Sequence, residues 1–257
     1  MKKIQRYSLI AIPLLVACIF IQSGDSRAEN FDSSNRATQN TAQIKSIIYT
    51  PPSTPERKRN RPWQGNGAGS RSICLTPTNA QTLIAPVNHT GLTSKSHPTF
   101  SIYFAEVPNL TVRMSVKDRD NQKVVWIGDL EVKKTGISTF SLPKELVGLK
   151  PGIDYTWAVA MICDRDDRFQ DIFTEVPIKR VEISSQLKGE LSDTKNPIEK
   201  AKVLAKAGLF YDALGELVKL DDPTLKSHLI SSILEQAGLR NLALKIKKSL
   251  PTLRSLS

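Results

Sequence analysis

Apolar and polar residues alternate over much of the region between residues 81 and 184. In the segment 110–117 every second residue is apolar, a period typical of a strand with one buried face. After a polar break at 118–121 the alternation resumes with Val124 and Trp126 on the apolar face, which predicts a β-hairpin. Such short strands separated by turn residues favour an antiparallel β-sandwich over residues 71–185.

One segment of this region refines the expected fold. Residues 149–157 read Leu-Lys-Pro-Gly-Ile-Asp-Tyr-Thr-Trp, an order similar to the tyrosine corner of fibronectin type III and immunoglobulin-like domains. There the hydroxyl group, here that of Tyr155, bonds to the backbone a few residues upstream. The alternative is an ordinary turn followed by an aromatic strand. Residues 155–163 are apolar on both faces, so we expect a central strand of the sandwich.

The hydrophobic period lengthens to that of helices after residue 196. Asn196, Pro197 and Glu199 form a strong helix start, with Asn as N-cap, Pro in the first turn and Glu closing a capping box. Gly208 is expected to end this helix. We predict a small α-helical C-terminal region, 196–250, of about four short helices in two hairpins. Part of it resembles a single tetratricopeptide unit, which favours a helical cap on the sandwich or a small docking module over a repeat array.

The N-terminus has the pattern of a targeting segment. A basic start precedes the apolar run 9–21, and small residues precede Glu29, as at a signal-peptide cleavage site. We therefore predict a signal peptide over residues 1–28 and a protein exported to the periplasm or beyond the cell. Two alternatives are an uncleaved N-terminal anchor and a lipoprotein anchored at Cys18, which ends a lipobox-like Leu-Val-Ala-Cys. No other segment is long and apolar enough to cross a membrane.

Residues 29–70 are polar, lack a periodic pattern and are rich in Pro and Gly, so we predict a disordered linker. It contains a basic patch, which could bind an acidic polysaccharide or membrane headgroups, or could simply be solvated. The patch comprises Arg57, Lys58, Arg59 and Arg61.

The net charge of the chain is +11. The sandwich region 81–184 is neutral, whereas residues 29–80 and 185–257 carry +4 each. The positive charge therefore does not form one basic surface, and with an export signal this argues against nucleic acid as a partner.

The chain offers little material for catalysis, with three cysteines and three histidines. Removal of the signal peptide leaves Cys74 and Cys163, the only possible intramolecular disulfide in an oxidising compartment; two separately buried thiols are the alternative. The acidic residues that follow Cys163 could bind Ca²⁺, but interleaved arginines favour a loop of mutually compensating charges. These acidic residues are Asp164, Asp166, Asp167 and Asp171. We predict no catalytic residue, cofactor or metal.

Several short motifs occur together along the chain. They are Pro51-Pro52, the run 67–71 (Gly-Ala-Gly-Ser-Arg) ahead of Cys74, Tyr155-x-Trp157, Ile162-Cys163-Asp164 with Arg168, and Gly208 with Tyr211-Asp212-Ala213-Leu214. On these motifs the chain resembles a family of exported cyanobacterial proteins grouped as a domain of unknown function, number 928. It departs from the family pattern at Ser72, Phe169 and Val176-Pro177. The resemblance implies lineage, export and architecture, and it implies no activity.

The leading functional hypothesis is a non-enzymatic envelope or secreted module that presents the sandwich and the helical cap to a protein or polysaccharide partner. An envelope-acting hydrolase with dispersed catalytic residues, for which Asp166 is the best candidate, is the first alternative. Electrostatic attachment to an anionic polymer through the basic patch is the second. The sequence does not indicate the oligomeric state.

Overall fold

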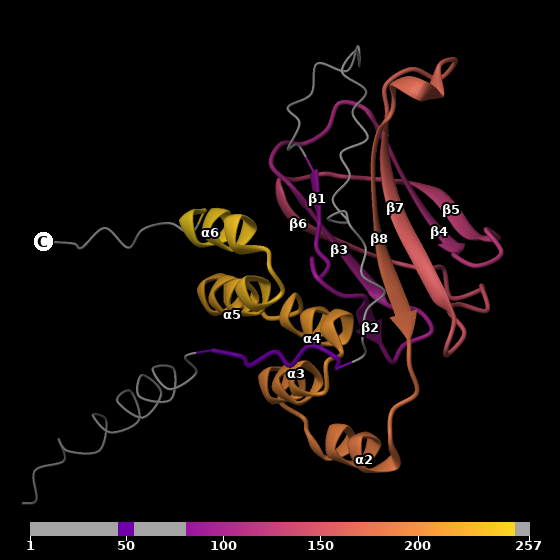
Figure 1. Ribbon diagram of the computed structural model, residues 1–257. Helices are drawn as coiled ribbons and strands as arrows, with labels where there is room; N and C mark the ends of the chain where they lie inside the picture. The colour runs from indigo at the N-terminus through magenta and orange to yellow at the C-terminus, as the bar shows by residue number, and fades with distance from the viewer. Residues whose placement is uncertain (1–45, 54–80, 250–257) are drawn as a thin grey trace, which may run out of the picture. The chain divides into compact units, whose positions relative to one another are not determined.

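The computed structural model describes residues 46–53 and 81–249 (Figure 1). The strands in these ranges are β1 (Gln81–Leu83), β2 (Gly91–Thr93), β3 (Thr99–Phe104), β4 (Thr111–Asp118), β5 (Val124–Leu130), β6 (Gly136–Ser141), β7 (Asp154–Ile162) and β8 (Ile172–Arg180). The helices are the short 3-10 helix η1 (Arg168–Gln170), α2 (Ser185–Asp193), α3 (Pro197–Lys206), α4 (Phe210–Leu217), α5 (Pro223–Gln236) and α6 (Arg240–Lys248). Within these ranges no helix has both the length and the apolar character of a membrane span.

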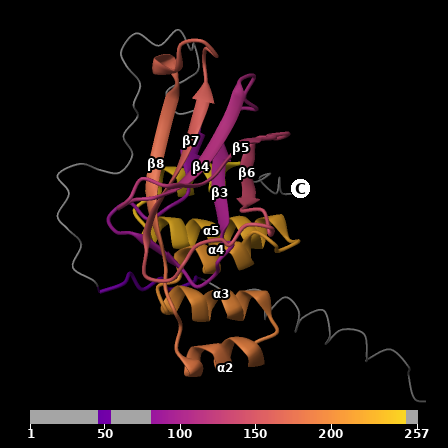
Figure 2. The ribbon, with the colours of Figure 1, turned by 90° about the vertical axis from the view of Figure 1, so that its right-hand side faces the viewer.

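The strands form two mostly antiparallel sheets, seen from two sides in Figures 1 and 2. One has the order β1-β3-β6, and the other has the order β2-β8-β7-β4-β5, in which only β2 and β8 are parallel. β7 lies between β4 and β8, as the two apolar faces of this segment predict. The rings of Phe100 on β3 and Trp157 on β7 have centroids 5.0 Å apart, so side chains from both sheets meet in one core.

The hairpin predicted from the alternating pattern is formed by β4 and β5. At its turn the Asp118 carboxylate accepts hydrogen bonds from the N–H groups of Asp120 (3.0 Å) and Asn121 (3.3 Å). The prediction that Val124 lies on the buried face is wrong, since its side chain is 53% exposed. Val116 pairs with Trp126 but the next residue pairs with Val124, and this β-bulge turns Val124 outward.

Helix α3 begins and ends where the sequence predicts. The Asn196 side chain accepts hydrogen bonds from the N–H groups of Ile198 (2.8 Å) and Glu199 (3.4 Å), and Gly208 follows the helix with a φ of +77°. Glu199, predicted to close a capping box, contacts Lys202 instead, with 2.7 Å between carboxylate and ammonium. The same helix packs against α4, and α5 packs against α6, so the two expected helix pairs are present.

The described residues contain five α-helices rather than the expected four, because the sequence pattern does not reveal α2. The Ser184 hydroxyl caps this helix by accepting a hydrogen bond from the Leu187 N–H (3.2 Å). No residue of α2 is buried. A helix that packs no side chain into a core has no apolar stripe, and the stripe is the signal by which a helix is recognised in a sequence.

Residues 46–53 form an extended segment that lies against the helices. Ile47 and Tyr49 are buried, whereas Ile48 between them is exposed. The Gln236 side chain on α5 donates a hydrogen bond to the Ile47 carbonyl (2.6 Å) and accepts one from the Tyr49 N–H (2.9 Å). This part of the predicted disordered linker is therefore packed, because its buried side chains and its backbone find partners on helices far away in the sequence. The rest of that linker lies outside the described residues.

Candidate functional site

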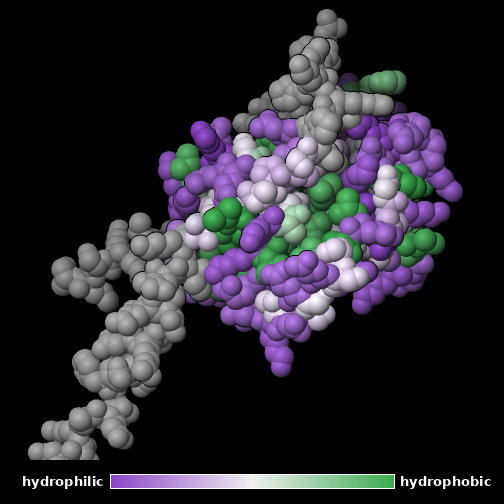
Figure 3. Space-filling view, turned by 60° about the horizontal axis from the view of Figure 1, so that its bottom comes forward, coloured by the Kyte–Doolittle hydropathy of each residue, from purple (hydrophilic) through white to green (hydrophobic). Residues whose placement is uncertain are grey.

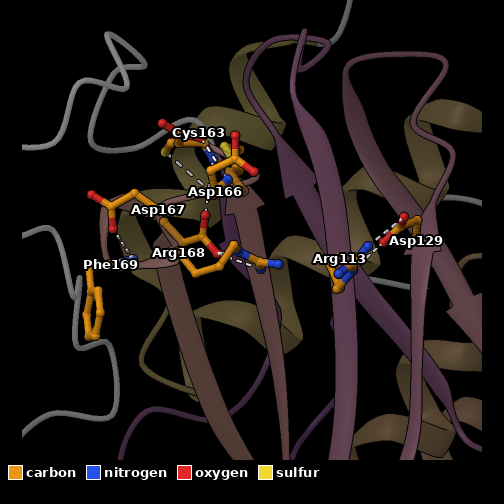
Figure 4. A network of polar contacts seen from close by, with 10 residues as sticks. Arg113, Asp129, Cys163, Asp166, Asp167, Arg168 and Phe169 are labelled. Atoms are coloured by element: carbon orange, nitrogen blue, oxygen red, sulfur yellow. Dashed lines mark hydrogen bonds and ion pairs between the residues drawn. The ribbon is translucent and has the colours of Figure 1, made fainter.

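The loop between β7 and β8 contains the acidic residues that the sequence singles out (Figure 4). The Asp167 carboxylate caps the short helix η1 by accepting a hydrogen bond from the Phe169 N–H (3.1 Å). Asp171 accepts hydrogen bonds from the Cys163 N–H (3.2 Å) and from Arg168 Nε (2.7 Å). These contacts join the two ends of the loop and hold its turn in place.

The carboxylates of this loop accept hydrogen bonds from the backbone and from an arginine of the same loop. Asp164 accepts a hydrogen bond from the Asp166 N–H (2.9 Å), and Asp167 and Asp171 are engaged as described above. A Ca²⁺ site would need several of these oxygens to converge on one point. Among the residues that the structure describes, no three His, Cys, Asp or Glu side chains gather in a way that could hold a metal ion.

Phe169 is the most exposed large apolar side chain of the described residues, at 100%. It belongs to η1 and points away from the sheet at the tip of the loop (Figure 4). Phe173, at the start of β8, is also partly exposed, at 37%. In the sequence, Phe169 is distinguished only as a departure from the family pattern. An aromatic residue inside a run of charged residues draws attention to this position, but it does not reveal that the side chain is exposed.

An exposed ion pair lies near this loop on the neighbouring strands β4 and β5 (Figure 4). Arg113 donates two hydrogen bonds to Asp129, from Nε to Oδ1 (2.6 Å) and from Nη2 to Oδ2 (3.0 Å). The hydrogen bond with Arg113 lowers the pKa of Asp129, and the positive charges of Arg165 and Arg168 lower it further. The arginines of the β7–β8 loop and the Arg113–Asp129 ion pair therefore lie close enough to interact electrostatically.

A buried contact joins the helical region to the larger sheet. Trp157 Nε1 on β7 donates a hydrogen bond to the Tyr211 hydroxyl on α4 (2.8 Å), which itself donates to the Pro177 carbonyl on β8 (3.3 Å). Tyr211 is fully buried, and this burial raises its pKa. On β2 the absence of a side chain at Gly91 makes room for the tyrosine ring, since a Cβ there would lie 2.5 Å from Tyr211 Cε2.

The next residue, Asp212, extends this contact to the segment after β2. Its carboxylate is buried and accepts hydrogen bonds from the Thr93 hydroxyl (2.5 Å), the Ser94 N–H (2.8 Å) and the Ser94 hydroxyl (2.6 Å). The Tyr-Asp pair of the motif Tyr211-Asp212-Ala213-Leu214 thus binds helix α4 to the sheets. Its role in the described residues is architectural.

Tyr155 and the histidines also make contacts within the fold. The Tyr155 hydroxyl accepts a hydrogen bond from the Lys150 N–H five residues upstream (3.0 Å), a contact of the kind that a tyrosine corner would make. His89 Nε2 lies 2.5 Å from the Tyr49 hydroxyl, and His97 Nε2 lies 2.9 Å from the Leu146 carbonyl. His228 is exposed on α5.

Several predicted features lie outside the described residues. They are the signal peptide, Cys18, Cys74 and the basic patch of Arg57, Lys58, Arg59 and Arg61. Because Cys74 is among them, its pairing with Cys163 stays a prediction.

Comparison with known proteins places the chain in a family. No curated protein matches it. A solved structure of Astrotactin-2, a conserved vertebrate-specific and perforin-like membrane protein involved in neuronal development, is similar with a TM-score of 0.26 and 10% sequence identity, covering 67% of this chain and 36% of that chain. A family model matches residues 66–246, more than half of the chain, which therefore belongs to the family described as Domain of Unknown Function (DUF928).

Proposed function

We propose that this protein is an exported, non-enzymatic binding module whose β7–β8 loop contacts a protein or polysaccharide partner of the cell envelope. The observation that carries the proposal is the full exposure of Phe169 on a loop whose conformation is held by Asp167 and Asp171. Aromatic side chains provide much of the binding energy where proteins meet their partners, both in apolar pockets and against flat ligand faces.

The rigidity of the loop supports this proposal. A flexible loop loses conformational entropy when it binds, at a cost of about 0.5–1.5 kcal/mol for each side chain that is immobilised. In this loop the capped helix η1 and the Arg168–Asp171 ion pair (2.6 Å) already restrict the backbone around Phe169. An exposed aromatic residue on such a loop is available for binding at a small entropic cost.

The position of the loop also fits an immunoglobulin-like or fibronectin type III sandwich, which we propose as the fold type. The sheet β1-β3-β6 would correspond to strands A-B-E, and β8-β7-β4-β5 to strands G-F-C-C′. The hydrogen bond between Tyr155 and Lys150 supports this assignment. The β7–β8 loop would then be the F–G loop, which contacts the ligand in antibody variable domains.

Export and the disulfide belong to the same proposal. Cleavage after Ala28 would release the signal peptide, and an oxidising compartment would allow Cys74 and Cys163 to pair. Because Cys163 directly follows β7, this bond would fix the base of the loop that carries Phe169.

Site-specific photo-crosslinking in the native host tests the proposed function. A photoreactive phenylalanine analogue replaces Phe169 in one strain and Val147, an 82% exposed residue before β7, in a control strain. We expect a discrete covalent adduct with one envelope protein or polysaccharide from position 169 and none from position 147. Equal adduct patterns at both positions, or no adduct at 169 with correctly exported protein, would refute the proposal.

A further inference from the structure

Helix α6 presents a basic surface with an apolar residue at its centre. Its buried side is formed by Leu242, Ala243 and Ile246. Its exposed side, which we call the outer face of α6, consists of Arg240, Asn241, Leu244, Lys245, Lys247 and Lys248. No acidic residue occurs in this helix.

Most of the positive charge on the outer face is unpaired. Lys247 contacts Glu235 on α5, with 2.6 Å between ammonium and carboxylate. In the part of the chain that the structure describes, Arg240, Lys245 and Lys248 make no ion pair. Three cations on a nine-residue helix therefore remain available to an anionic partner.

Leu244 distinguishes this surface from a simple basic patch. Its side chain is 52% exposed, and it lies one helical turn from both Arg240 and Lys248, which places the three residues on one side of the helix. Arg240 and Leu244 also line a surface hollow together with Glu235 and Gln236. A soluble polyanion could use the cations but would gain nothing from the leucine.

We propose that the outer face of α6 binds the surface of an anionic lipid bilayer, with Leu244 entering the headgroup region and the basic residues contacting the headgroups. A basic helical face with an apolar residue suits this interface, in which charge attracts the helix and apolar area holds it. Each Lys or Arg near the surface of an anionic bilayer strengthens binding about fivefold. The contact is therefore weak, reversible and sensitive to salt.

This surface is separate from the loop of the proposed function. Phe169 lies in a loop of mixed charge after β7, whereas Leu244 lies among cations on the last described helix. A module could thus rest on a membrane through α6 and use the β7–β8 loop for another partner, and either contact could fail without the other.

Fluorescence quenching by lipids tests the α6 contact in the full chain. Leu244→Trp is compared with the control Ile127→Trp on β5, a position of similar exposure (56%). The vesicles contain phosphatidylcholine with or without phosphatidylglycerol, and the acyl chains are brominated to quench tryptophan. We expect more quenching at position 244 than at position 127, and only with vesicles that contain phosphatidylglycerol. Equal quenching at both positions, or none at 244, would overturn the proposal.

Charge variants show whether the contact is local. Adding Lys245→Glu and Lys248→Glu to Leu244→Trp should abolish the additional quenching. Adding Lys188→Glu and Lys195→Glu, which change the net charge equally at exposed positions of the α2 region, should preserve it. Equal loss from both pairs would show that only the net charge matters. If alginate in solution instead shifts the emission from position 244 while vesicles do not quench it, the surface binds polyanions and the membrane proposal is wrong.

Discussion

Asp212 offers the sharpest test of how the helices are held to the sheets. Asp212→Ala removes a buried carboxylate and leaves the Thr93 hydroxyl and both donors of Ser94 without their acceptor. Hydrogen bonds to a charged group contribute about 1.5–3 kcal/mol each. The three bonds share one carboxylate and the hydroxyls can rotate, so their contributions do not add fully. We expect the free energy of unfolding to fall by about 3–5 kcal/mol.

Urea unfolding followed by tryptophan fluorescence measures this loss, because Trp157 lies in the core next to Tyr211, the neighbour of Asp212. Asp221→Ala is the matched control, since it makes the same substitution at an exposed position after α4 and should change stability by less than about 0.5 kcal/mol. In a double-mutant cycle, Ser94→Ala should show a coupling energy with Asp212→Ala of at least about 1 kcal/mol. A loss below about 1 kcal/mol for Asp212→Ala, or no coupling, would show that this carboxylate does not hold α4 in place.

Three further predictions concern other contacts. Gly91→Ala should destabilise the fold by about 1–3 kcal/mol because its Cβ would meet the Tyr211 ring. The control Gly189→Ala, in open space on α2, should stabilise the fold by up to about 1 kcal/mol. Similar shifts of the melting temperature in the two variants would contradict this prediction. Burial lowers the pKa of His89, so the folded state binds fewer protons, and stability should fall as the pH drops below about 6.5. In the His89→Gln variant, the midpoint of urea unfolding should depend less on pH below about 6.5 than in the wild type. Non-reducing mass spectrometry should find a Cys74–Cys163 peptide, and Cys163→Ser should cost about 3–5 kcal/mol; free thiols in exported protein would refute the pairing.

The predicted elements differ from the observed ones where local pattern and tertiary packing disagree. The alternation along residues 110–117 predicts β4 because buried side chains at Val112, Met114 and Val116 alternate with partly exposed ones. The same rule misplaces Val124, since a bulge depends on the register with a neighbouring strand. Helix α2 is not predicted, because none of its residues is buried in a core and its sequence therefore lacks an apolar stripe.

In the candidate site, too, the sequence pattern reveals some features and tertiary packing determines the others. The acidic loop after Cys163 is visible in the sequence, and interleaved arginines already suggest that its charges compensate one another. The exposure of Phe169 cannot be inferred from the sequence, because an aromatic residue between charges is as compatible with a buried position. The burial of Tyr49 cannot be inferred either, because the composition of residues 29–70 is that of a linker. Its partners Gln236 and His89 are distant in the chain.

Hydrophobic period, helix caps and turn residues act over a few neighbouring positions, so most of the local elements of this protein can be predicted from its sequence, although helix α2 cannot. The sequence also indicates the family, through short motifs. Three properties emerge only when the chain is folded: Tyr211 and Asp212 bind helix α4 to the sheets, residues 46–53 pack on α5, and Phe169 and Leu244 remain at the surface. These properties depend on contacts between residues far apart in the chain, and no local pattern encodes such contacts.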